Sequence, residues 1–153
     1  MSSCLVCSGK ISPFISFGKM PVANGFLMPE EYGTEFFFDL EVGMCHSCSM
    51  VQLTQPVNPD QLFHENYAYF ASTSASMTDH FKFFSQEVSG RLEGIKDPFV
   101  VEIGSNDGIM LKHFSNEGVR HLGVEPSQNV ADEAIRNGVS TQCSFFDEAT
   151  AAE

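Results

Sequence analysis

Residues 98–108 read PFVVEIGSNDG, and this stretch decides the fold of the second half of the chain. An apolar run that includes Phe99 and Ile103 leads directly into a short loop of small and polar residues. Apolar residues at helical spacing follow, from Ile109 to Phe114. A strand, a glycine-containing loop and a helix in this order form the geometry in which an open α/β sheet holds a nucleotide-like ligand at the carboxyl end of a strand.

The glycine pattern of this loop favours one class of ligand. A dinucleotide fingerprint, G-x-G-x-x-G, would need glycine where the chain has Asn106 and Ile109. The chain instead has Glu102, Gly104 and Gly108, the pattern of methyltransferases that bind S-adenosylmethionine, a ligand with no pyrophosphate. The two glycines permit close approach of the backbone, and asparagine tolerates the left-handed backbone of such a turn. Glu102 is expected to orient the loop or the ammonium group of the ligand.

A second acidic residue follows at the distance expected for a ribose-binding carboxylate. Residues 121–127, HLGVEPS, read as a second strand that ends at Glu125. Glu125 comes 21 residues after Gly104, close to the spacing of about 20 residues seen for the acid that accepts hydrogen bonds from ribose hydroxyls. Two alternatives stay open: a generic βαβ unit with a surface glutamate, and a site for NAD.

Composition and charge narrow the class of protein. The chain has 153 residues and a net charge of −12, from 20 acidic and 8 basic residues. The basic residues do not cluster, so nucleic acid is not an expected partner. No apolar run is long enough to cross a bilayer, and the N-terminal residues lack the apolar region of a secretory signal. We therefore expect a cytoplasmic protein with no membrane partner.

Four of the five cysteines form two matching pairs near the N-terminus: Cys4, Cys7, Cys45 and Cys48. Two C-x-x-C pairs predict two knuckles that complete a tetrahedral Cys4 zinc site, with no open position for catalysis. The 37 residues between the pairs must then form an extended hairpin or loop. Two disulfides and a redox C-x-x-C are the alternatives. His46 lies inside the second knuckle and is expected to be a loop side chain, because four thiolates already saturate the metal.

The chain is expected to fall into three parts: a zinc-binding module (1–60), a helical connector (61–97) and a methyltransferase portion (98–153). Residues 35–42 alternate with strand periodicity, and residues 77–92 place apolar side chains on one helix face. For the last part we expect strands at 99–103, 121–125 and 139–143, with helices at 107–117 and 127–137.

The stretch NYAYFASTSASM precedes the connector helix and carries Tyr67 and Tyr69. Two interpretations stay open: a helix N-cap with a solvated loop, or a lid whose two tyrosines face the ligand cleft. His80 lies early in the helix, where a histidine is more often a packed or surface side chain than a catalytic one.

The order of these motifs, C-x-x-C, C-x-x-C, YAYFAS, EIGSNDG and GVEPS, resembles the N-terminal part of the sugar C-methyltransferases. The resemblance covers essentially the whole chain. It implies a zinc-binding N-terminal domain, a central Rossmann-like methyltransferase domain and a C-terminal sugar-binding domain. It also implies methylation, by S-adenosylmethionine, of a carbon next to the keto group of a nucleotide-linked deoxysugar. The fold class expected is therefore α/β: a partial Rossmann-like methyltransferase sheet preceded by a small Cys4 zinc-binding β module.

The resemblance implies roles for individual residues of this chain. It implies that the four paired cysteines bind zinc, that Glu125 binds ribose, and that Tyr67 and Tyr69 lie near the sugar substrate. The cofactor loop that it implies comprises Glu102, Gly104, Ser105, Asn106 and Gly108. Further strands and the sugar domain are missing, so we expect a fragment or a truncated reading frame that is inactive alone. The general base is not identified, and Tyr67 and His80 are only weak candidates for it.

Two other functions stay open. The chain could be a stand-alone zinc-ribbon module that binds a protein partner through its aromatic surface. An open sheet edge at the first strand would also favour pairing with a second copy. Alternatively, the chain could belong to a methyltransferase with a non-sugar acceptor.

Overall fold

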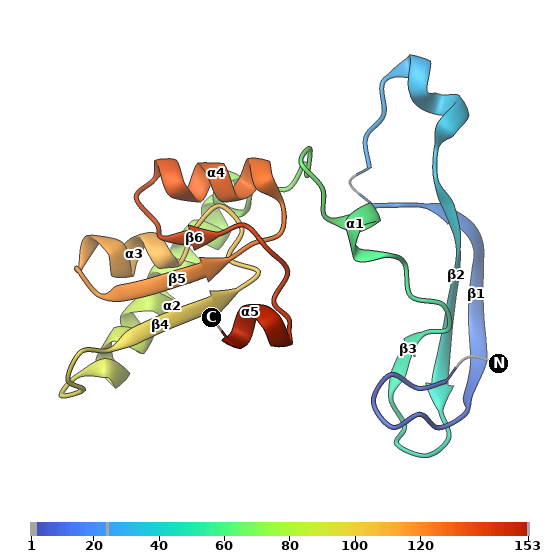
Figure 1. The fold of residues 1–153 in the computed structure, drawn as a ribbon, viewed down its shortest axis with the longest axis horizontal. Helices are drawn as coiled ribbons and strands as arrows, with labels where there is room; N and C mark the ends of the chain where they lie inside the picture. The colour runs from blue at the N-terminus through green and yellow to red at the C-terminus, as the bar shows by residue number, and fades with distance from the viewer. Residues whose placement is uncertain (1–2, 24, 153) are drawn as a thin grey trace. The chain divides into compact units, whose positions relative to one another are not determined.

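The computed structural model describes residues 3–23 and 25–152 and divides the chain into two compact units, Met1–Leu62 and Phe63–Glu153. Figure 1 shows the strands and helices of each unit along the chain. Both strands and helices are present, so the α/β class is confirmed. Among the described residues, no helix has the length and apolar character needed to cross a bilayer.

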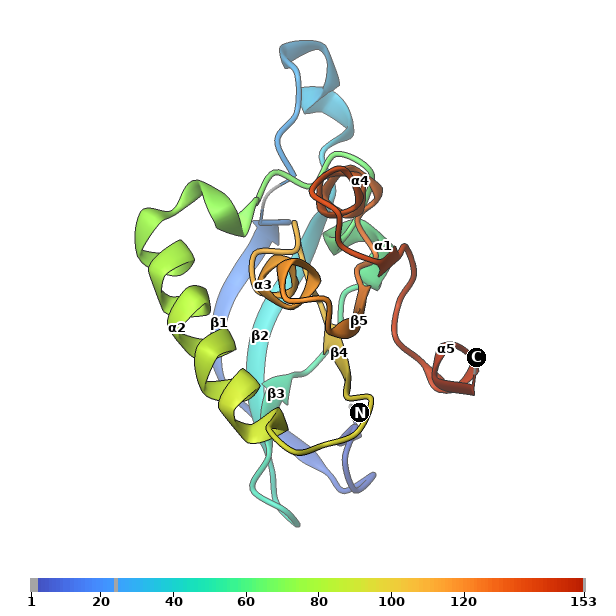
Figure 2. The ribbon, with the colours of Figure 1, turned by 90° about the vertical axis from the view of Figure 1, so that its left-hand side faces the viewer.

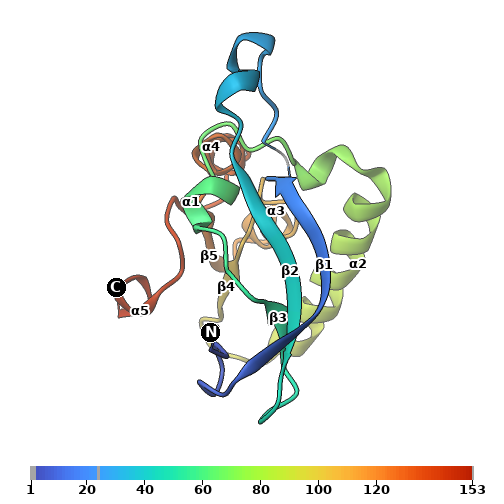
Figure 3. The ribbon, with the colours of Figure 1, turned by 90° about the vertical axis from the view of Figure 1, so that its right-hand side faces the viewer.

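The first unit is built on a three-stranded antiparallel sheet in the order β1-β2-β3. Its strands are β1 (Ile11–Pro21), β2 (Phe37–Cys45) and β3 (Val51–Leu53). The long pair β1 and β2 runs from the match of Ile11 with Cys45 to that of Pro21 with Phe37, and Figure 3 shows these strands side by side. This hairpin spans the long gap between the cysteine pairs. The unit ends at the short helix α1 (Pro59–Leu62).

The second unit contains a three-stranded parallel sheet in the order β4-β5-β6. The strands are β4 (Phe99–Ile103), β5 (Arg120–Val124) and β6 (Thr141–Gln142). Its helices are α2 (Ala75–Leu92), α3 (Leu111–Asn116), α4 (Gln128–Arg136) and α5 (Glu148–Ala152). Parallel neighbours need helical crossovers, and α3 and α4 supply them. As a result the carboxyl ends of β4 and β5 lie next to each other.

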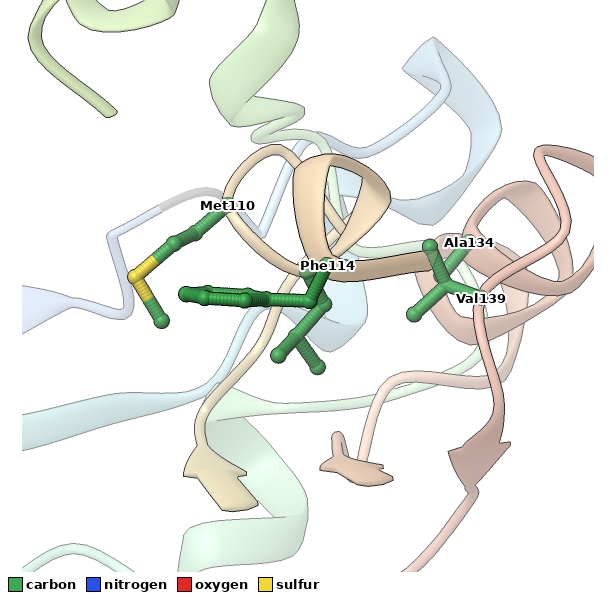
Figure 4. Packing of buried hydrophobic residues seen from close by; sticks show 5 residues of the cluster. Met110, Phe114, Ala134 and Val139 are labelled. Atoms are coloured by element: carbon green, nitrogen blue, oxygen red, sulfur yellow. The ribbon is translucent and has the colours of Figure 1, made fainter. Parts of the chain in front are cut away.

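The core of the second unit lies between these helices and one face of β4. Met110, Leu111, Phe114, Ala134 and Val139 are buried together, and Phe81, Val88 and Leu92 of α2 pack against them. Figure 4 shows the side chains of this buried cluster and labels Met110, Phe114, Ala134 and Val139, and Figure 2 shows α2 next to α3. Because side chains alternate along a strand, Val100 packs on this core while Phe99, Val101 and Ile103 are exposed.

Two elements of the second unit differ most from the sequence-based expectation. The helix expected to begin at residue 107 begins at Leu111. The reason is that Asn106 (φ 50°) and Gly108 (φ 76°) adopt left-handed backbone, which interrupts a right-handed helix. The expected strand at 139–143 is limited to Thr141–Gln142. β4 has the expected bounds, and α2, α4 and β5 differ from expectation by only a few residues.

Candidate functional site

The four paired cysteines meet at one end of the first unit. Their sulfur atoms all lie within 4.8 Å of one another. The Sγ atoms of Cys4 and Cys48 are 3.7 Å apart, and those of Cys7 and Cys45 are 3.5 Å apart. A tetrahedral zinc ion with Zn–S bonds of about 2.3 Å needs sulfurs about 3.8 Å apart, so the cluster fits zinc. All five cysteines of the chain are free, so the structure contains neither of the two disulfides considered as an alternative.

The two knuckles have the same local hydrogen bonds to sulfur. Val6 N–H donates to Cys4 Sγ and Ser47 N–H donates to Cys45 Sγ, each at 3.4 Å. Such donors favour a thiolate. The backbone N–H groups of Cys48 and Ser47 lower the pKa of the Cys45 thiol to about 6, whereas hydrogen bonds with the sulfurs of Cys48 and Cys45 raise the pKa of the Cys7 thiol to about 12. A thiolate is the form that a metal ion binds.

The knuckles also share a tight exit from the turn. Ser8 and Ser49, each directly after the second cysteine, have φ values of 60° and 61°. Their N–H groups donate to the carbonyls of Cys4 and Cys45 at 2.8 and 3.0 Å. His46 takes no part in the cluster, because its Nε2 lies 2.6 Å from the Ser12 hydroxyl. It is a loop side chain, as expected.

Gly9 is a residue of this centre that the sequence did not single out. A Cβ added there would lie 2.7 Å from Ser47 Oγ and 3.1 Å from Cys45 Sγ. The first knuckle therefore approaches the second so closely that no side chain fits between them. The only sequence signal was the glycine two residues after Cys7.

In the second unit, a cavity of about 520 Å³ lies at the carboxyl ends of β4 and β5. Pockets for small ligands commonly have volumes of about 300–1,000 Å³. Seven predicted site residues line the cavity: Tyr67, Tyr69, Glu102, Gly104, Ser105, Asn106 and Glu125. Further lining residues that the sequence did not indicate include Met77, Phe81, Pro126, Ser144, Phe145 and Phe146. Residues far apart in the sequence thus form a single site, mostly apolar with a few polar groups.

Gly108 and His80 do not line this cavity. Gly108 is packed instead: a Cβ there would lie 2.8 Å from Val139 Cγ2 and 3.2 Å from Ala134 Cβ. His80 is exposed on α2, with its ring stacked on that of Phe84. Gly104, in contrast, has φ 72° and open space where a Cβ would be.

Glu125 shapes the loop above the cavity. Its carboxylate is buried and accepts hydrogen bonds from the backbone N–H of Asn106 (3.0 Å, Oε2) and of Ser127 (2.8 Å, Oε1). Gly104 N–H donates to the Val124 carbonyl at 2.8 Å. The loops that follow β4 and β5 are therefore joined through one carboxylate. Each carboxylate oxygen has two acceptor sites, so Glu125 retains capacity for a ligand.

Glu102 has a different environment. Its Oε2 is buried and has no hydrogen-bond partner. Burial, together with the nearby Asp107 carboxylate, raises the pKa of Glu102 to about 7. A cation placed beside such a carboxylate would stabilise its charged form. Asp107 was not singled out from the sequence, although it directly follows Asn106.

Residues 67–72, here called the tyrosine segment, are attached to the same loops. Asn106 Nδ2 donates to the Tyr69 carbonyl at 3.1 Å, and Ala71 N–H donates to Asn106 Oδ1 at 2.8 Å. The helix N-cap, one of the two interpretations left open for this stretch, is present, since the Ser74 hydroxyl accepts from Met77 N–H at 3.3 Å.

Comparison with known proteins finds two similarities. A family model described as "Putative zinc binding domain" matches residues 4–63 and so includes the cysteine cluster. The chain is also similar to C-methyltransferase NovU of Streptomyces niveus, with 36% identity over 128 residues, which is 83% of this chain and 30% of that protein. The chain therefore spans less than a third of the length of this relative. The converging thiolates on the first unit and the loop pocket on the second agree with the N-terminal portion of the sugar C-methyltransferase family that the sequence resembles.

Proposed function

We propose that the chain supplies the zinc-binding part and a cofactor-binding part of an S-adenosylmethionine-dependent C-methyltransferase. The similarity to a C-methyltransferase and the zinc-binding family model support this assignment. In this proposal residues 1–60 are the zinc module, residues 61–97 the helical connector, and residues 98–153 the start of a Rossmann-like methyltransferase sheet. The parallel order β4-β5-β6 suits such a sheet.

The observation that carries the proposal is the charge of the cavity. Two carboxylates, Glu102 and Glu125, line it, and no lysine or arginine is among its lining residues. A dinucleotide brings a pyrophosphate, which would meet these carboxylates with no basic partner. S-adenosylmethionine brings a sulfonium and an ammonium group. Aromatic faces such as those of Tyr67 and Phe81, which also line the cavity, attract cations.

Each lining residue then has a distinct task. Glu102 would pair with the ammonium group, because its Oε2 is buried without a partner. Glu125 would accept the ribose hydroxyls with its remaining lone pairs. The open space at Gly104 admits the ligand beside the backbone. When bound, S-adenosylmethionine supplies an electrophilic methyl group; the residues of this chain bind and orient it and keep water away.

The zinc ion has a structural role in this proposal. Cys4, Cys7, Cys45 and Cys48 would hold it, since four thiolates leave no open position for a substrate. The donor set and the sulfur separations fit such a site.

For the acceptor we propose a nucleotide-linked keto-deoxysugar, on the strength of the family resemblance. Tyr67 and Tyr69 line the cavity and are the residues of this chain proposed to face that sugar. Of the two weak candidates for the general base, Tyr67 lines the cavity and His80 does not. Neither is assigned that role.

One observation favours a second function, an interaction module. Phe99, Val101 and Ile103 on β4 are 51%, 46% and 60% exposed, and an apolar strand at a sheet edge favours pairing with another chain. Sedimentation of the chain at increasing concentration tests it. A dimer that dissociates when charged residues are introduced on β4 would favour this function. A monomer at all concentrations would exclude self-association.

Calorimetric titration with S-adenosylmethionine and with NAD tests the main proposal. We expect heat from the first ligand and none from the second. Glu102→Gln removes the charge proposed to pair with the ammonium group, so it should weaken binding at least tenfold. Glu117→Gln is the control, because Glu117 is an exposed residue that accepts from Ser89 outside the cavity. Equal heats from both ligands, or no heat from S-adenosylmethionine, would contradict the proposal.

A further inference from the structure

The tyrosine segment presents alternate residues to the cavity. Tyr67, Tyr69 and Ala71 line it, and the intervening Ala68 and Phe70 do not. Phe70 has extended backbone, with φ −110° and ψ 114°. Residues two apart on an extended chain point to the same side. The segment belongs to neither described sheet, so its backbone groups need partners other than a sheet ladder.

Asn106 satisfies two of these groups with one side chain. Its amide nitrogen donates to the Tyr69 carbonyl at 3.1 Å, and its amide oxygen accepts from Ala71 N–H at 2.8 Å. The two contacts flank Phe70, as the peptide group of a neighbouring strand would do in a sheet. The asparagine therefore serves as a one-residue strand partner for the tyrosine segment.

The backbone of Asn106 is used as well. It adopts the left-handed region with φ 50°, and its N–H donates to Glu125 Oε2 at 3.0 Å. Asparagine is one of the few residues with a side chain that takes this conformation at low cost. Glycine would also allow the turn, but it has no side-chain amide. Asparagine therefore both adopts the turn and binds the tyrosine segment.

Two neighbouring contacts extend this attachment. Asn129 Nδ2, in the first turn of α4, donates to the Tyr67 carbonyl at 2.8 Å. Ser72 N–H donates to Asp107 Oδ2 at 2.9 Å. Both partners lie in the loops or helix starts that follow β4 and β5. The tyrosine segment is thus held at four backbone positions, two of them by Asn106.

We propose that Asn106 is a positioning residue that fixes Tyr67 and Tyr69 as a wall of the cavity, in register with Glu125. One residue then links the wall to the carboxylate, so a ligand meets a site whose parts are already in place. The identity of the ligand rests on the proposed function, whereas the attachment of the tyrosine segment does not.

Two substitutions at this position separate the backbone role from the side-chain role. Asn106→Gly keeps the left-handed turn and removes both side-chain hydrogen bonds. Asn106→Asp keeps the acceptor for Ala71 N–H, removes the donor to the Tyr69 carbonyl and adds a carboxylate next to that carbonyl. We expect the segment to detach at Tyr69 and Ala71 in the first variant and at Tyr69 alone in the second.

Hydrogen exchange of the 153-residue protein measures the attachment directly. In Asn106→Gly the amide of Ala71 should exchange about tenfold faster or more, because its acceptor is gone. In Asn106→Asp it should exchange at close to the original rate. The amides of Gly123 and Val124 in β5 report whether each variant is folded, and their exchange should be unchanged.

Tyrosine fluorescence gives a second readout, which reports how accessible the rings of the tyrosine segment are to solvent. The chain has no tryptophan and three tyrosines, so a Tyr32→Phe background leaves only Tyr67 and Tyr69. Acrylamide should quench their emission more strongly in Asn106→Gly. Asn137→Ala is the matched control, since Asn137 donates to Glu133 at the end of α4, away from the cavity. Its quenching and exchange should equal those of the starting protein.

Titration of the same variants with S-adenosylmethionine separates this inference from the proposed function. About tenfold weaker binding in Asn106→Gly, with Asn137→Ala unchanged, supports both. No binding by the starting protein, together with faster Ala71 exchange in Asn106→Gly, supports the attachment and contradicts the proposed ligand. Unchanged Ala71 exchange and unchanged quenching in Asn106→Gly would overturn the positioning role, whatever the ligand.

Discussion

The two units of the chain are stabilised in different ways. In the first unit the buried cluster consists of Cys4, Ile11 and Cys45, so two of its three members are proposed zinc ligands. In the second unit the buried cluster is apolar and spans α3, α4 and the chain before β6, with α2 packed on it. A small module with so little apolar burial depends on its metal for folding. The second unit can fold on its core, which leaves polar groups at its cavity free for a ligand.

The largest effect expected from this comparison is unfolding of the first unit while the second stays folded. Cys45→Ser, or removal of zinc by a chelator, should abolish hydrogen-exchange protection across β1–β3, because apparent zinc-binding energies in such sites reach about 10–16 kcal/mol. The strands β4 and β5 should keep their protection. Cys143→Ser is the control, since Cys143 is exposed and outside the cluster. Simultaneous unfolding of both units would show that they are not stabilised separately.

The reciprocal change is Phe114→Ala in the second unit. Phe114 is fully buried, and removal of such a side chain typically costs about 3–5 kcal/mol of stability. Urea unfolding followed at β4 and β5 should show this loss, while zinc content stays at one per chain. Phe83→Ala, on the 68% exposed Phe83 of α2, should cost little. A loss of zinc in Phe114→Ala would mean that the units do not fold independently.

The cavity of the second unit should make its stability depend on pH. The pKa of Glu102 is raised from 4.5 to about 7, so the folded state keeps a proton that the unfolded state loses across this range. The free energy of unfolding should therefore fall as pH rises from 4.5 to 7, by up to about 3 kcal/mol from this group. Glu102→Gln should remove that part of the fall.

Urea unfolding at about pH 5 and about pH 7.5 measures this dependence, with Glu117→Gln as the control for general acidity. The chain without a ligand is used, because a cation bound beside Glu102 would favour its charged form. An equal fall in Glu102→Gln and in the starting protein would show that Glu102 is not the group responsible.

The smallest expected effect concerns the close contact of the two knuckles. Gly9→Ala would place a Cβ 2.7 Å from Ser47 Oγ and 3.1 Å from Cys45 Sγ. We expect zinc affinity to fall about 10-fold or more, as for other substitutions that disturb groups around metal ligands. Competition with a chromophoric chelator measures it. Gly33→Ala is the control in the same unit, because nothing lies within 4 Å of a Cβ there; equal affinities for the two variants would contradict a close contact at Gly9.

Local patterns predicted much of this structure. The matching C-x-x-C pairs predicted one cluster, and the apolar run before the loop predicted β4 with its observed bounds. The left-handed turn at Asn106 was also anticipated from its residue type. These features depend on residues that are close together along the chain, so they can be recognised in the sequence.

Long-range contacts were not predictable in this way. The Asn106 side chain binds the backbone 35 and 37 residues away, and Gly9 meets a side chain of the other knuckle. Gly108 was assigned to the cofactor loop, yet its surroundings are Val139 and Ala134. Nothing local distinguishes a glycine that admits a ligand from one that admits a packed side chain. The missed residues share this dependence on the tertiary fold.

The proposed function depends above all on the binding of S-adenosylmethionine by the loop after β4. Titration of the isotope-labelled chain with this ligand, followed by amide chemical shifts in NMR spectra, measures that binding residue by residue. We expect shifts at Gly104, Ser105, Asn106 and Glu125, with the amides of β1–β3 unaffected. Shifts confined to Met1–Leu62, or no shifts at saturating ligand, would contradict the proposed function.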